Sequence, residues 1–368
     1  MPFSHIESRL GMLRAMMAEE ELDVLVVLSS ENYNGESVAY ISGFTGSSCA
    51  LLISPNRAML VTDGRYAVQA REQSPFEVVL QGRESLRDRT VMALRDGGWS
   101  TAGFEAGRLS VDMFRSLERS VPVWRDCSAL LPSLRRCKDG VEVAAVSRAA
   151  EIACSAYEEA LEHVRVGMTE IEFNALLEYL VRKKGAECGW KGGRFVVASG
   201  ERGAMPHGRA TERAFQLGDI VTVDFGATVD GYMSDLTRNF SMGPLSPKGR
   251  EIEAVLLEAA AAAAEALRPG VAGSLVDSVA RGIITDRGWG GNFSHGLGHG
   301  LGLEIHEPPR LSPLSEDVLR EGDVVTIEPG IYIEGWGGMR IEDDYLVTGS
   351  GAVCISGGRG RSTREISL

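Results

Sequence analysis

The sequence predicts two domains: a small α/β domain over residues 1–132 and a larger α+β domain over residues 133–368 with an internal pseudo-two-fold repeat. The first reason is length, because 368 residues exceed what one hydrophobic core usually spans. The second reason is the alternation of helical and strand patterns over roughly the first 130 residues. The third is a phrase of nine residues that occurs twice in the rest of the chain and indicates a duplicated unit.

The elements of the first domain follow from apolar spacing and turn residues. Apolar side chains at helical spacing predict a helix from Ser4 to Glu21, and the run from Leu22 to Leu28 predicts a buried strand. Two further apolar runs flank Pro55-Asn56-Arg57, whose turn residues predict a hairpin. The pattern also indicates a strand over residues 76–80 and a helix over residues 83–96.

The second domain begins with two predicted helices. A basic segment from Leu131 to Gly140 marks the expected domain boundary. After it, residues 142–164 carry a long helical pattern. Thr169 and Glu172 have the spacing of a capping box, which predicts a second helix that ends at Gly185.

The same layout returns about a hundred residues later. A helical pattern over residues 248–267 is followed by Arg268-Pro269-Gly270 and by another helix that ends at Gly288. Gly288 lies 103 residues after Gly185. The duplication therefore covers both helices as well as the strands that follow them.

The repeated phrase is a strand that ends on a carboxylate. Residues 218–226 and 322–330 both begin with Gly-Asp, continue with four apolar or β-branched residues, and then place an acid in the same register. That acid is Asp224 in the first copy and Glu328, 104 residues later, in the second. Each copy then adds a second acid. The resulting set is Asp224, Asp235, Glu328 and Glu342.

Four acids at matching positions favour a metal site. Without cations, four converging carboxylates would repel one another and raise one another's pKa values. Two bridged divalent ions would relieve that repulsion and would activate a water molecule as a nucleophile. The alternative is that the acids only cap turns, which suits Asp230 and Glu334 because each precedes a turn glycine. Asp224 and Glu328 instead follow β-branched runs, where an unpaired charge would be half-buried.

Histidines cluster near these acids in the sequence. His295, His299 and His306 fall within twelve residues, and glycines between them allow close approach of the backbone. His207 follows a proline in a separate segment. Carboxylates with one imidazole form a ligand set that suits Mn²⁺ and also accepts Co²⁺, Zn²⁺ or Fe²⁺. The sequence therefore predicts two divalent metal ions, with Mn²⁺ preferred.

Composition narrows the classes of partner. A net charge of −13 argues against nucleic acid and anionic membranes as partners. No apolar run approaches the roughly 20 residues that cross a bilayer, and no signal peptide opens the chain. Six cysteines without CxxC spacing favour reduced thiols. We therefore expect a cytoplasmic protein.

At these motifs the chain resembles the pita-bread metallopeptidases, in particular the Xaa-Pro aminopeptidase (aminopeptidase P) and prolidase branch. The resemblance extends into the first domain, which is similar to the creatinase/prolidase N-terminal domain, through Gly43-Phe-Thr-Gly-Ser-Ser48 and Thr62-Asp-Gly-Arg-Tyr66. The second domain carries Val223-Asp-Phe-Gly226, Ser234-Asp-Leu-Thr-Arg238, Gly298-His-Gly-Leu-Gly-Leu-Glu-Ile-His-Glu307, Ile327-Glu-Pro-Gly-Ile-Tyr332 and Arg340-Ile-Glu-Asp343.

The resemblance implies a role for each of the site residues. It assigns Asp224 to one metal ion, and Asp235 and Glu342 as bridges between two ions. It assigns His299 and Glu328 to the second ion, with Glu328 also carrying the proton from the attacking water to the leaving nitrogen. The remaining roles fall to substrate-facing residues. His306 would stabilise the oxyanion or shuttle a proton, His207 and His295 would line the substrate groove, and Arg340 would hold the Glu342 carboxylate or the substrate.

The leading hypothesis is a metal-dependent exopeptidase that removes an N-terminal residue from short peptides with proline at the second position. Within the family, the alternative is a strict Xaa-Pro dipeptidase. A dipeptidase must recognise the carboxylate of proline, whereas an aminopeptidase leaves room beyond it. The resemblance also implies a homodimer.

More distant alternatives use the same fold. Creatinase-like C–N hydrolysis needs no metal, and some relatives only bind proteins, as histone chaperones do. Both are disfavoured because all five metal ligands are present. Methionine aminopeptidases share these ligands but usually lack a first domain of this kind.

Overall fold

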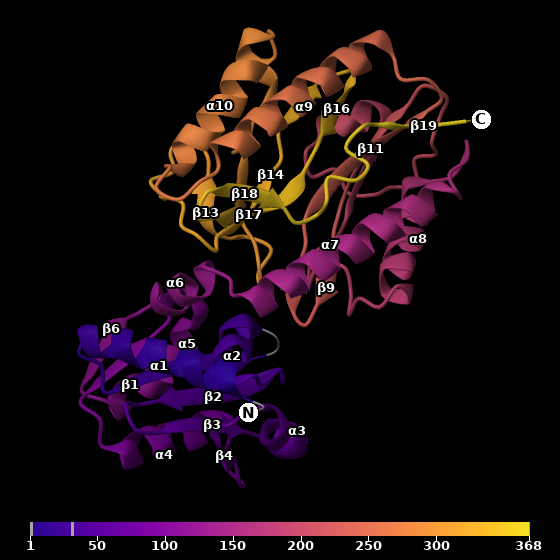
Figure 1. The fold of residues 1–368 in the computed structure, drawn as a ribbon. Coiled ribbons are helices and arrows are strands. Elements are labelled where there is room, and N and C mark those ends of the chain that lie inside the picture. The colour runs from indigo at the N-terminus through magenta and orange to yellow at the C-terminus, as the bar shows by residue number, and fades with distance from the viewer. Residues whose placement is uncertain (1–2, 31–32, 368) are drawn as a thin grey trace. The chain divides into compact units, whose positions relative to one another are not determined.

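The computed structural model describes residues 3–30 and 33–367. It divides into two compact units, residues 1–135 and residues 136–368. Each unit has its own sheets and helices, and each is described by itself below (Figure 1).

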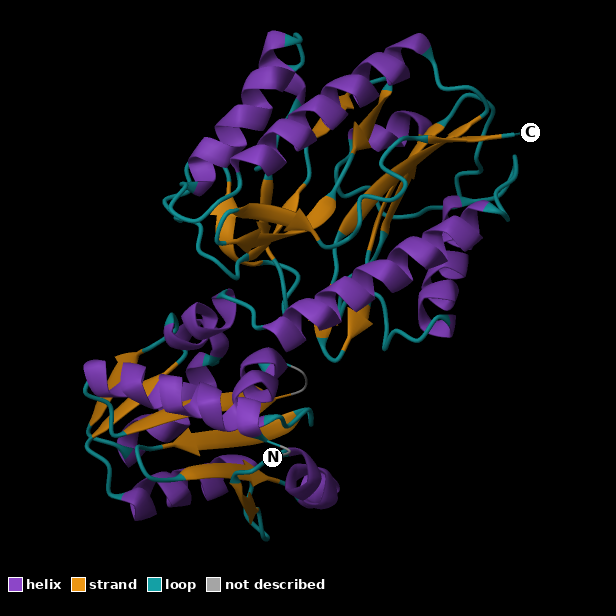
Figure 2. Cartoon of the chain, viewed as in Figure 1, coloured by secondary structure: helices purple, strands orange, loops and turns teal. Residues whose placement is uncertain are grey.

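The first unit is built on one sheet of six strands, in the order β4-β3-β2-β1-β5-β6. Strand β2 runs antiparallel to both of its neighbours, and the remaining pairs are parallel. Helices cover both faces of this sheet (Figure 2). The strands are β1 (Val24–Ser30), β2 (Ser48–Ile53), β3 (Ala58–Thr62), β4 (Glu77–Leu80), β5 (Thr101–Phe104) and β6 (Val123–Asp126).

Six helices and three short 3₁₀ turns accompany this sheet among the described residues. One face of the sheet packs on α4, where Val24 and Val26 contact Ala93 and Leu94 in a single buried cluster. The helices are α1 (Ser4–Glu19), α2 (Gly35–Ser42), α3 (Ala67–Gln73), α4 (Leu86–Gly97), α5 (Val111–Leu117) and α6 (Leu130–Arg136). The 3₁₀ turns are η1 (Gly64–Tyr66), η2 (Ala106–Arg108) and η3 (Glu118–Ser120).

The segment expected to be the domain boundary is partly helical. Helix α6 runs through Pro132, which occupies its third position, where a missing backbone N–H costs little. Arg136, the last residue of this helix and the first of the second unit, is buried. Its guanidinium donates two hydrogen bonds to the Asp323 carboxylate, both at 2.8 Å. A buried ion pair at this point fixes the start of the second unit in place.

The second unit contains two larger sheets and two short hairpins. The four-stranded sheet has the order β19-β11-β8-β7, and the five-stranded sheet has the order β13-β12-β14-β17-β18. Its first strands are β7 (Val196–Ser199), β8 (Ile220–Phe225), β9 (Thr228–Val229), β10 (Tyr232–Met233) and β11 (Leu236–Met242). The later strands are β12 (Gly298–Gly300), β13 (Glu307–Leu311), β14 (Val324–Ile327), β15 (Gly330–Ile333), β16 (Gly337–Arg340), β17 (Asp343–Thr348), β18 (Gly351–Cys354) and β19 (Arg364–Ile366).

The helices of the second unit pack as two pairs, one for each half. In Figure 1, α7 and α8 lie on one side of the strands and α9 and α10 on the other. The helices are α7 (Gly140–Leu161), α8 (Glu170–Lys183), α9 (Pro247–Ala266) and α10 (Gly273–Asp286), with short turns η4 (Gly200–Ala204) and η5 (Gly290–Asn292). Each pair covers its own hydrophobic cluster.

The internal duplication predicted from the sequence is present in the fold. Strands β8 and β11 pair antiparallel in one half, as β14 and β17 do in the other. Between them, each half carries a small hairpin, β9–β10 or β15–β16. The first hairpin turns at Asp230 and Gly231, whose φ angles are 49° and 80°, a left-handed conformation that glycine adopts readily.

Contacts between the halves are polar and buried. The Arg238 guanidinium donates to Asp343 at 2.8 Å, and each of these side chains is at most 2% exposed. Asn239 donates to the Arg340 carbonyl at 2.7 Å. These bonds hold β11 against the segment around β17, so the acids carried by the two halves face a common space.

Two properties bear on the expected setting of the protein. Within the described ranges, no helix is long and apolar enough to cross a membrane. The six cysteines form no disulfide there, and Cys137 is exposed while Cys49, Cys127 and Cys154 are buried.

Candidate metal centre

One pocket of about 830 Å³ in the second unit contains every site residue that the sequence predicted. These residues come from both halves of the duplicated fold. They are Asp224, Asp235, His299, Glu328 and Glu342, with His207, His295, His306 and Arg340.

The four acids occupy matching positions in the two halves. Asp224 lies near the end of β8, and Glu328 directly follows β14. Asp235 precedes β11, and Glu342 precedes β17. Because β8 pairs with β11 and β14 pairs with β17, each half brings its two acids to the same end of a strand pair. The duplication thereby produces a set of four converging carboxylates.

His299 projects a neutral nitrogen at these acids. Its Nδ1 donates to the Gly300 carbonyl at 3.0 Å, which leaves the lone pair on Nε2. Nε2 lies 3.6 Å from an oxygen of Asp235 and 3.4 Å from an oxygen of Glu328. Burial lowers the pKa of His299 to about 3, so the imidazole is neutral. A lone pair that faces carboxylates is the arrangement of a metal ligand.

The acids are held in an environment that disfavours their charge. Burial raises the pKa of Asp224, Asp235 and Glu328, and it raises the pKa of Glu342 to about 8. Neighbouring carboxylates add to the effect at Asp235, Glu328 and Glu342. Such a cluster is stable in its ionised form only when positive charge is supplied.

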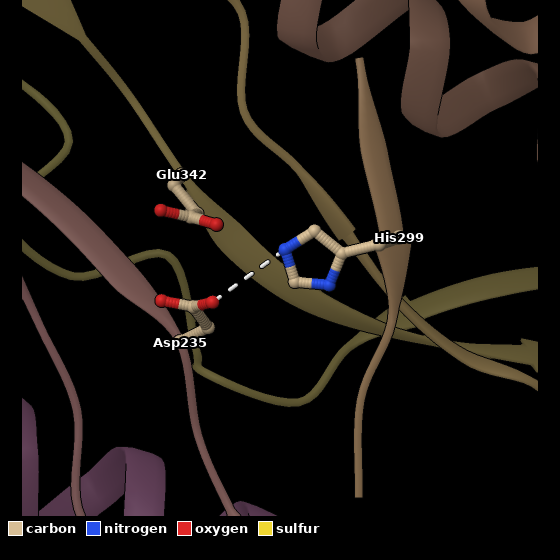
Figure 3. Close-up of side chains that lie close together, drawn as sticks. All are labelled: Asp235, His299 and Glu342. Atoms are coloured by element: carbon tan, nitrogen blue, oxygen red, sulfur yellow. Dashed lines mark ion pairs between the residues drawn. The ribbon is translucent and has the colours of Figure 1, made fainter. Parts of the chain in front are cut away.

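Three of these side chains already approach metal-binding distances. Ligand atoms of Asp235, His299 and Glu342 lie within 4.8 Å of one another, and all three side chains are buried (Figure 3). One oxygen of Asp224 and one of Asp235 are buried without a hydrogen-bond partner among the described residues. Unpaired buried oxygens of this kind are costly unless they bind a cation. The donor set therefore fits divalent metal ions.

Neighbouring polar residues form hydrogen bonds with Glu342 and with the backbone at Asp235. Thr237 donates its hydroxyl proton to Glu342 at 2.6 Å. The backbone N–H of Asp235 donates to the Asp344 carboxyl, with distances of 3.2 and 3.3 Å to its two oxygens. Asp344 is fully buried, and burial raises its pKa well above the ordinary value. Thr237 thereby orients the Glu342 carboxylate, and Asp344 holds the backbone at Asp235.

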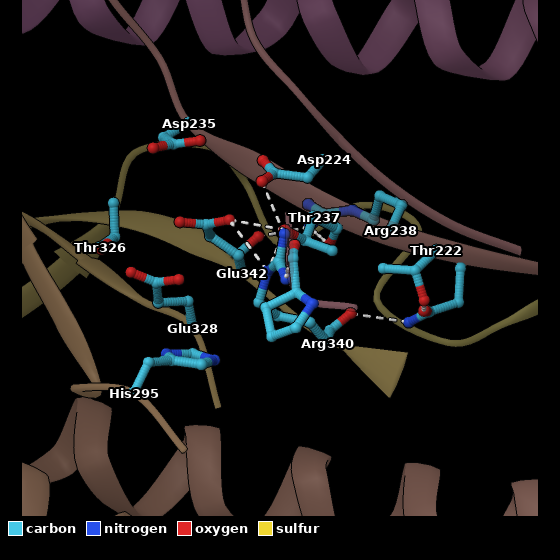
Figure 4. Close-up of polar contacts among 12 residues, drawn as sticks. Thr222, Asp224, Asp235, Thr237, Arg238, His295, Thr326, Glu328, Arg340 and Glu342 are labelled. Atoms are coloured by element: carbon cyan, nitrogen blue, oxygen red, sulfur yellow. Dashed lines mark hydrogen bonds and ion pairs between the residues drawn. The ribbon is translucent and has the colours of Figure 1, made fainter. Parts of the chain in front are cut away.

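Arg340 forms ion pairs with two of the acids, Glu342, which the sequence offered as its partner, and Asp224, which it did not. Its Nη2 donates to Asp224 at 2.6 Å, while its Nε lies 4.0 Å from Glu342 (Figure 4). It also donates to Thr237 at 2.9 Å and to the Tyr332 hydroxyl at 2.8 Å. Because its side chain is only 3% exposed and all three nitrogens are in use, Arg340 braces the site.

The remaining histidines lie around the pocket with different exposure. His207 and His306 are exposed, and His295 is half-buried. His295 donates through Nδ1 to the Gly296 carbonyl at 2.7 Å, so its Nε2 accepts from the Tyr332 hydroxyl at 2.9 Å. Burial lowers the pKa of His295 to about 4. Tyr332 therefore connects Arg340 to a neutral His295.

Sequence reasoning missed several residues of the pocket. No role was predicted for Tyr332, although its hydroxyl joins His295 and Arg340. Three arginines with exposed side chains also line the pocket: Arg194, Arg209 and Arg310. Arg310 lies on β13, four residues after His306. Its position next to the histidine cluster in the sequence could have indicated that it belongs to the site.

Two family models match the chain. The model described as metallopeptidase family M24 matches residues 144–349. The model described as the creatinase/prolidase N-terminal domain matches residues 9–137.

Named relatives are similar over nearly their whole length. An Xaa-Pro dipeptidase of Pyrococcus furiosus is 37% identical over 351 residues, which cover 94% of this chain and 97% of the relative. The crystal structure of an X-Pro aminopeptidase from Thermotoga maritima is 38% identical, with a TM-score of 0.89 and coverage of 94% of this chain and 98% of that one. The structure of an Xaa-Pro dipeptidase from Bacillus anthracis is 37% identical, with a TM-score of 0.90 and coverage of 98% and 99%.

Proposed function

Because this chain belongs to metallopeptidase family M24, we propose that it is a metal-dependent Xaa-Pro dipeptidase, which splits a dipeptide before its proline. Membership of the family confirms the resemblance identified from the sequence motifs, and with it the pita-bread fold and the creatinase/prolidase first domain. The sequence alone favoured an aminopeptidase. The relatives that are named dipeptidases favour the alternative.

The metal ligands in this proposal are the five residues that converge in the pocket. They are Asp224, Asp235, His299, Glu328 and Glu342. When bound, two divalent ions supply the positive charge that acidifies a water molecule and polarises the scissile carbonyl. The mixture of oxygen ligands with one imidazole suits Mn²⁺, which we propose as the preferred metal.

Residues of this chain would move the protons. Glu328 is the least buried of the four acids, with 17% of its side chain exposed. Burial raises its pKa well above the ordinary value, which suits a group that takes a proton from water and later gives it up. The proton goes to the proline nitrogen, which has no hydrogen of its own and must gain one to leave.

The histidines would face the substrate. Partial desolvation in the pocket and the nearby charge of Arg310 lower the pKa of His306, and its ring N–H would donate a hydrogen bond to the carbonyl oxygen as negative charge develops there. His207 is exposed at the same pocket and would bind the peptide. His295, held by Tyr332, would shape the wall of the groove.

The observation that carries the dipeptidase proposal is the free guanidinium of Arg310. Arg310 lines the pocket beside the metal ligands, and its positive charge contributes to lowering the pKa of both His299 and His306. Within the described part of the chain, its guanidinium has no hydrogen-bond or ion-pair partner; its backbone N–H donates to Asp317 and its carbonyl accepts from Ser315. An unpaired guanidinium in such a pocket is suited to a carboxylate, and a dipeptide ends in one at its proline.

A second candidate is an Xaa-Pro aminopeptidase, which would cleave longer peptides. The X-Pro aminopeptidase from Thermotoga maritima, whose crystal structure is similar, is 38% identical to this chain. The chemistry at the metal ions would be the same, and only the requirement for a free proline carboxylate would differ.

Hydrolysis of matched substrates separates the two candidates. Ala-Pro and Ala-Pro-Ala are incubated with the Mn²⁺-loaded protein, and the products are identified by chromatography. The proposal predicts cleavage of Ala-Pro with little cleavage of the tripeptide. Efficient release of alanine from Ala-Pro-Ala would favour the aminopeptidase instead.

A further inference from the structure

The pocket carries more positive charge than the dipeptidase proposal uses. Arg194 and Arg209 line it together with Arg310, and all three side chains are exposed. Among the described residues, the guanidinium groups of Arg194 and Arg209 have no hydrogen-bond or ion-pair partner; the backbone carbonyl of Arg209 accepts from Arg202. The whole chain has a net charge of −13, so unpaired cations gathered at one pocket run against its general composition.

Arg194 and Arg209 belong to one wall of the pocket. Phe195 points into the hydrophobic core, whereas Arg194 and Val196 on either side of it line the pocket, as expected when successive side chains alternate in direction. Val196 forms an isolated antiparallel bridge with Arg209. Residues that face each other across such a bridge project to the same side, so Arg209 stands beside Val196 and close to Arg194.

The other charges of the pocket are already matched. Its lining carboxylates, within the described ranges, are the four acids assigned to the metal ions. Two bound divalent ions would neutralise those four acids, and Arg340 is buried with its nitrogens engaged. Arg310 is assigned to the carboxylate of proline. Arg194 and Arg209 are left facing a site that offers them no anion.

We propose that Arg194 and Arg209 bind a second carboxylate on the substrate, so that the preferred substrates are dipeptides with an acidic residue, Asp or Glu, before proline. This inference rests on the proposed dipeptidase function and deepens it. A dipeptide has one terminal carboxylate, which Arg310 takes, and the only further carboxylate it can carry is that of its first side chain.

Both arginines are exposed, so the preference is moderate and depends on salt. Exposed ion pairs are weak, and two of them together correspond to a preference of about 3- to 20-fold in kcat/KM. Screening reduces interactions between exposed charges as ionic strength rises. The preference should therefore shrink between low salt and 0.5 M NaCl.

The test compares each acid with its uncharged amide of nearly the same shape. Values of kcat/KM are measured for Asp-Pro against Asn-Pro, and for freshly prepared Glu-Pro against Gln-Pro, with the Mn²⁺-loaded full chain. The same four substrates are given to a double variant, Arg194→Gln with Arg209→Gln. The control is Arg268→Gln, which removes an exposed arginine in the turn between α9 and α10, outside the pocket.

The expected result is an acid-over-amide ratio of about 3 to 20 in at least one pair, for the unmodified protein and the control alike. In the double variant the ratio should fall to about 1. A ratio near 1 in the unmodified protein, or an unchanged ratio in the double variant, overturns this inference while leaving the dipeptidase proposal intact. Failure to hydrolyse any of the four substrates and Ala-Pro as well overturns both.

Discussion

The Nε2 atom of His299 lies 3.6 Å from a carboxylate oxygen of Asp235, and it faces that oxygen with a lone pair because Nδ1 donates to the Gly300 carbonyl. A lone pair against a carboxylate is repulsive in the absence of a cation. Both side chains are 7% exposed, so water provides little compensation. The site is therefore arranged to bind a cation, and removal of that cation should lower the stability of the folded protein.

We predict that bound metal stabilises the folded protein and that His299 is required for the effect. A ligand at 100 times its dissociation constant adds about 2.7 kcal/mol to the free energy of unfolding. Thermal unfolding is measured in EDTA and after addition of Mn²⁺, for the unmodified chain, for His299→Ala and for His163→Ala. His163 is an exposed histidine outside the pocket and serves as the matched control.

The unmodified chain and the control should unfold at a higher temperature with Mn²⁺, whereas His299→Ala should lose most of the increase. Equal increases in all three proteins would show that the metal binds elsewhere.

Arg340 should be sensitive even to a conservative substitution. It donates to Asp224, Thr237 and Tyr332 at once, and a lysine cannot reproduce three separate directions. Removing the charge altogether, in Arg340→Met, leaves Asp224 buried without its partner and should cost about 3–5 kcal/mol in metal-free protein.

Urea unfolding in EDTA measures both variants, with Arg340→Lys expected to fall between Arg340→Met and the unmodified chain. With Mn²⁺, a loss of about 10- to 100-fold in kcat/KM is expected for Arg340→Lys, as for other residues that support metal ligands. Full activity in the lysine variant would contradict the bracing role.

Arg310 should control recognition of the free carboxylate. Arg310 is exposed, and an exposed ion pair contributes about 0.2–1 kcal/mol, so Arg310→Gln should raise KM for Ala-Pro by roughly 1.5- to 5-fold. The same variant should change KM much less for Ala-Pro-amide, which lacks the carboxylate. Steady-state kinetics on both substrates provide the measurement, with Arg268→Gln as the control. Equal effects on the two substrates would mean that Arg310 does not bind the carboxylate.

The first unit contains a separate titrating group, Glu105. It is 4% exposed and accepts from Asn34 at 2.7 Å and from Ser37 at 3.1 Å. Burial raises the pKa of Glu105 above its ordinary value, although these two donors oppose the shift. The folded state thus holds the proton more tightly than the unfolded state. The stability this provides is present below the ordinary pKa and is lost as pH rises through the folded value.

Glu105→Gln should therefore flatten the pH dependence of stability. Free energies of unfolding in urea are compared between about pH 4 and pH 8, a range that begins near the ordinary pKa of a glutamate. As pH rises, the free energy of unfolding of Glu105→Gln should increase relative to that of the unmodified chain. The exposed control Glu118→Gln should show no such relative increase. A difference between Glu105→Gln and the unmodified chain that stays constant with pH would refute the prediction.

Local features of the fold could be predicted because their causes lie within a few residues. The capping box at the start of α8 is present, with Thr169 and Glu172 bonded to each other's backbone N–H groups at 2.7 and 3.2 Å. Gly185 and Gly288 follow the ends of α8 and α10 with φ angles of 104° and 84°. The duplicated phrase likewise marked β8 and β14, because a strand followed by an acid has the same physical requirements in both copies.

Contacts between residues that lie far apart in the chain could not be predicted from the sequence. Arg340 was expected to hold the Glu342 carboxylate or the substrate, and its additional bond to Asp224, 116 residues away, was not predicted. Arg194 and Arg209 face one pocket only because Val196 bridges to Arg209. No periodicity encodes such a register. The strands β5 and β6 were missed because each has only four residues and a weak apolar pattern.

Bound metal and activity, measured together, decide whether a metal centre in this pocket hydrolyses Xaa-Pro dipeptides. Metal-free protein is titrated with Mn²⁺, and metal bound per chain and Ala-Pro hydrolysis are determined on the same samples. We expect no hydrolysis before titration and activity that rises with bound metal, to a plateau at about two ions per chain. Full activity in metal-free protein, or binding of Mn²⁺ without any hydrolysis, would contradict it.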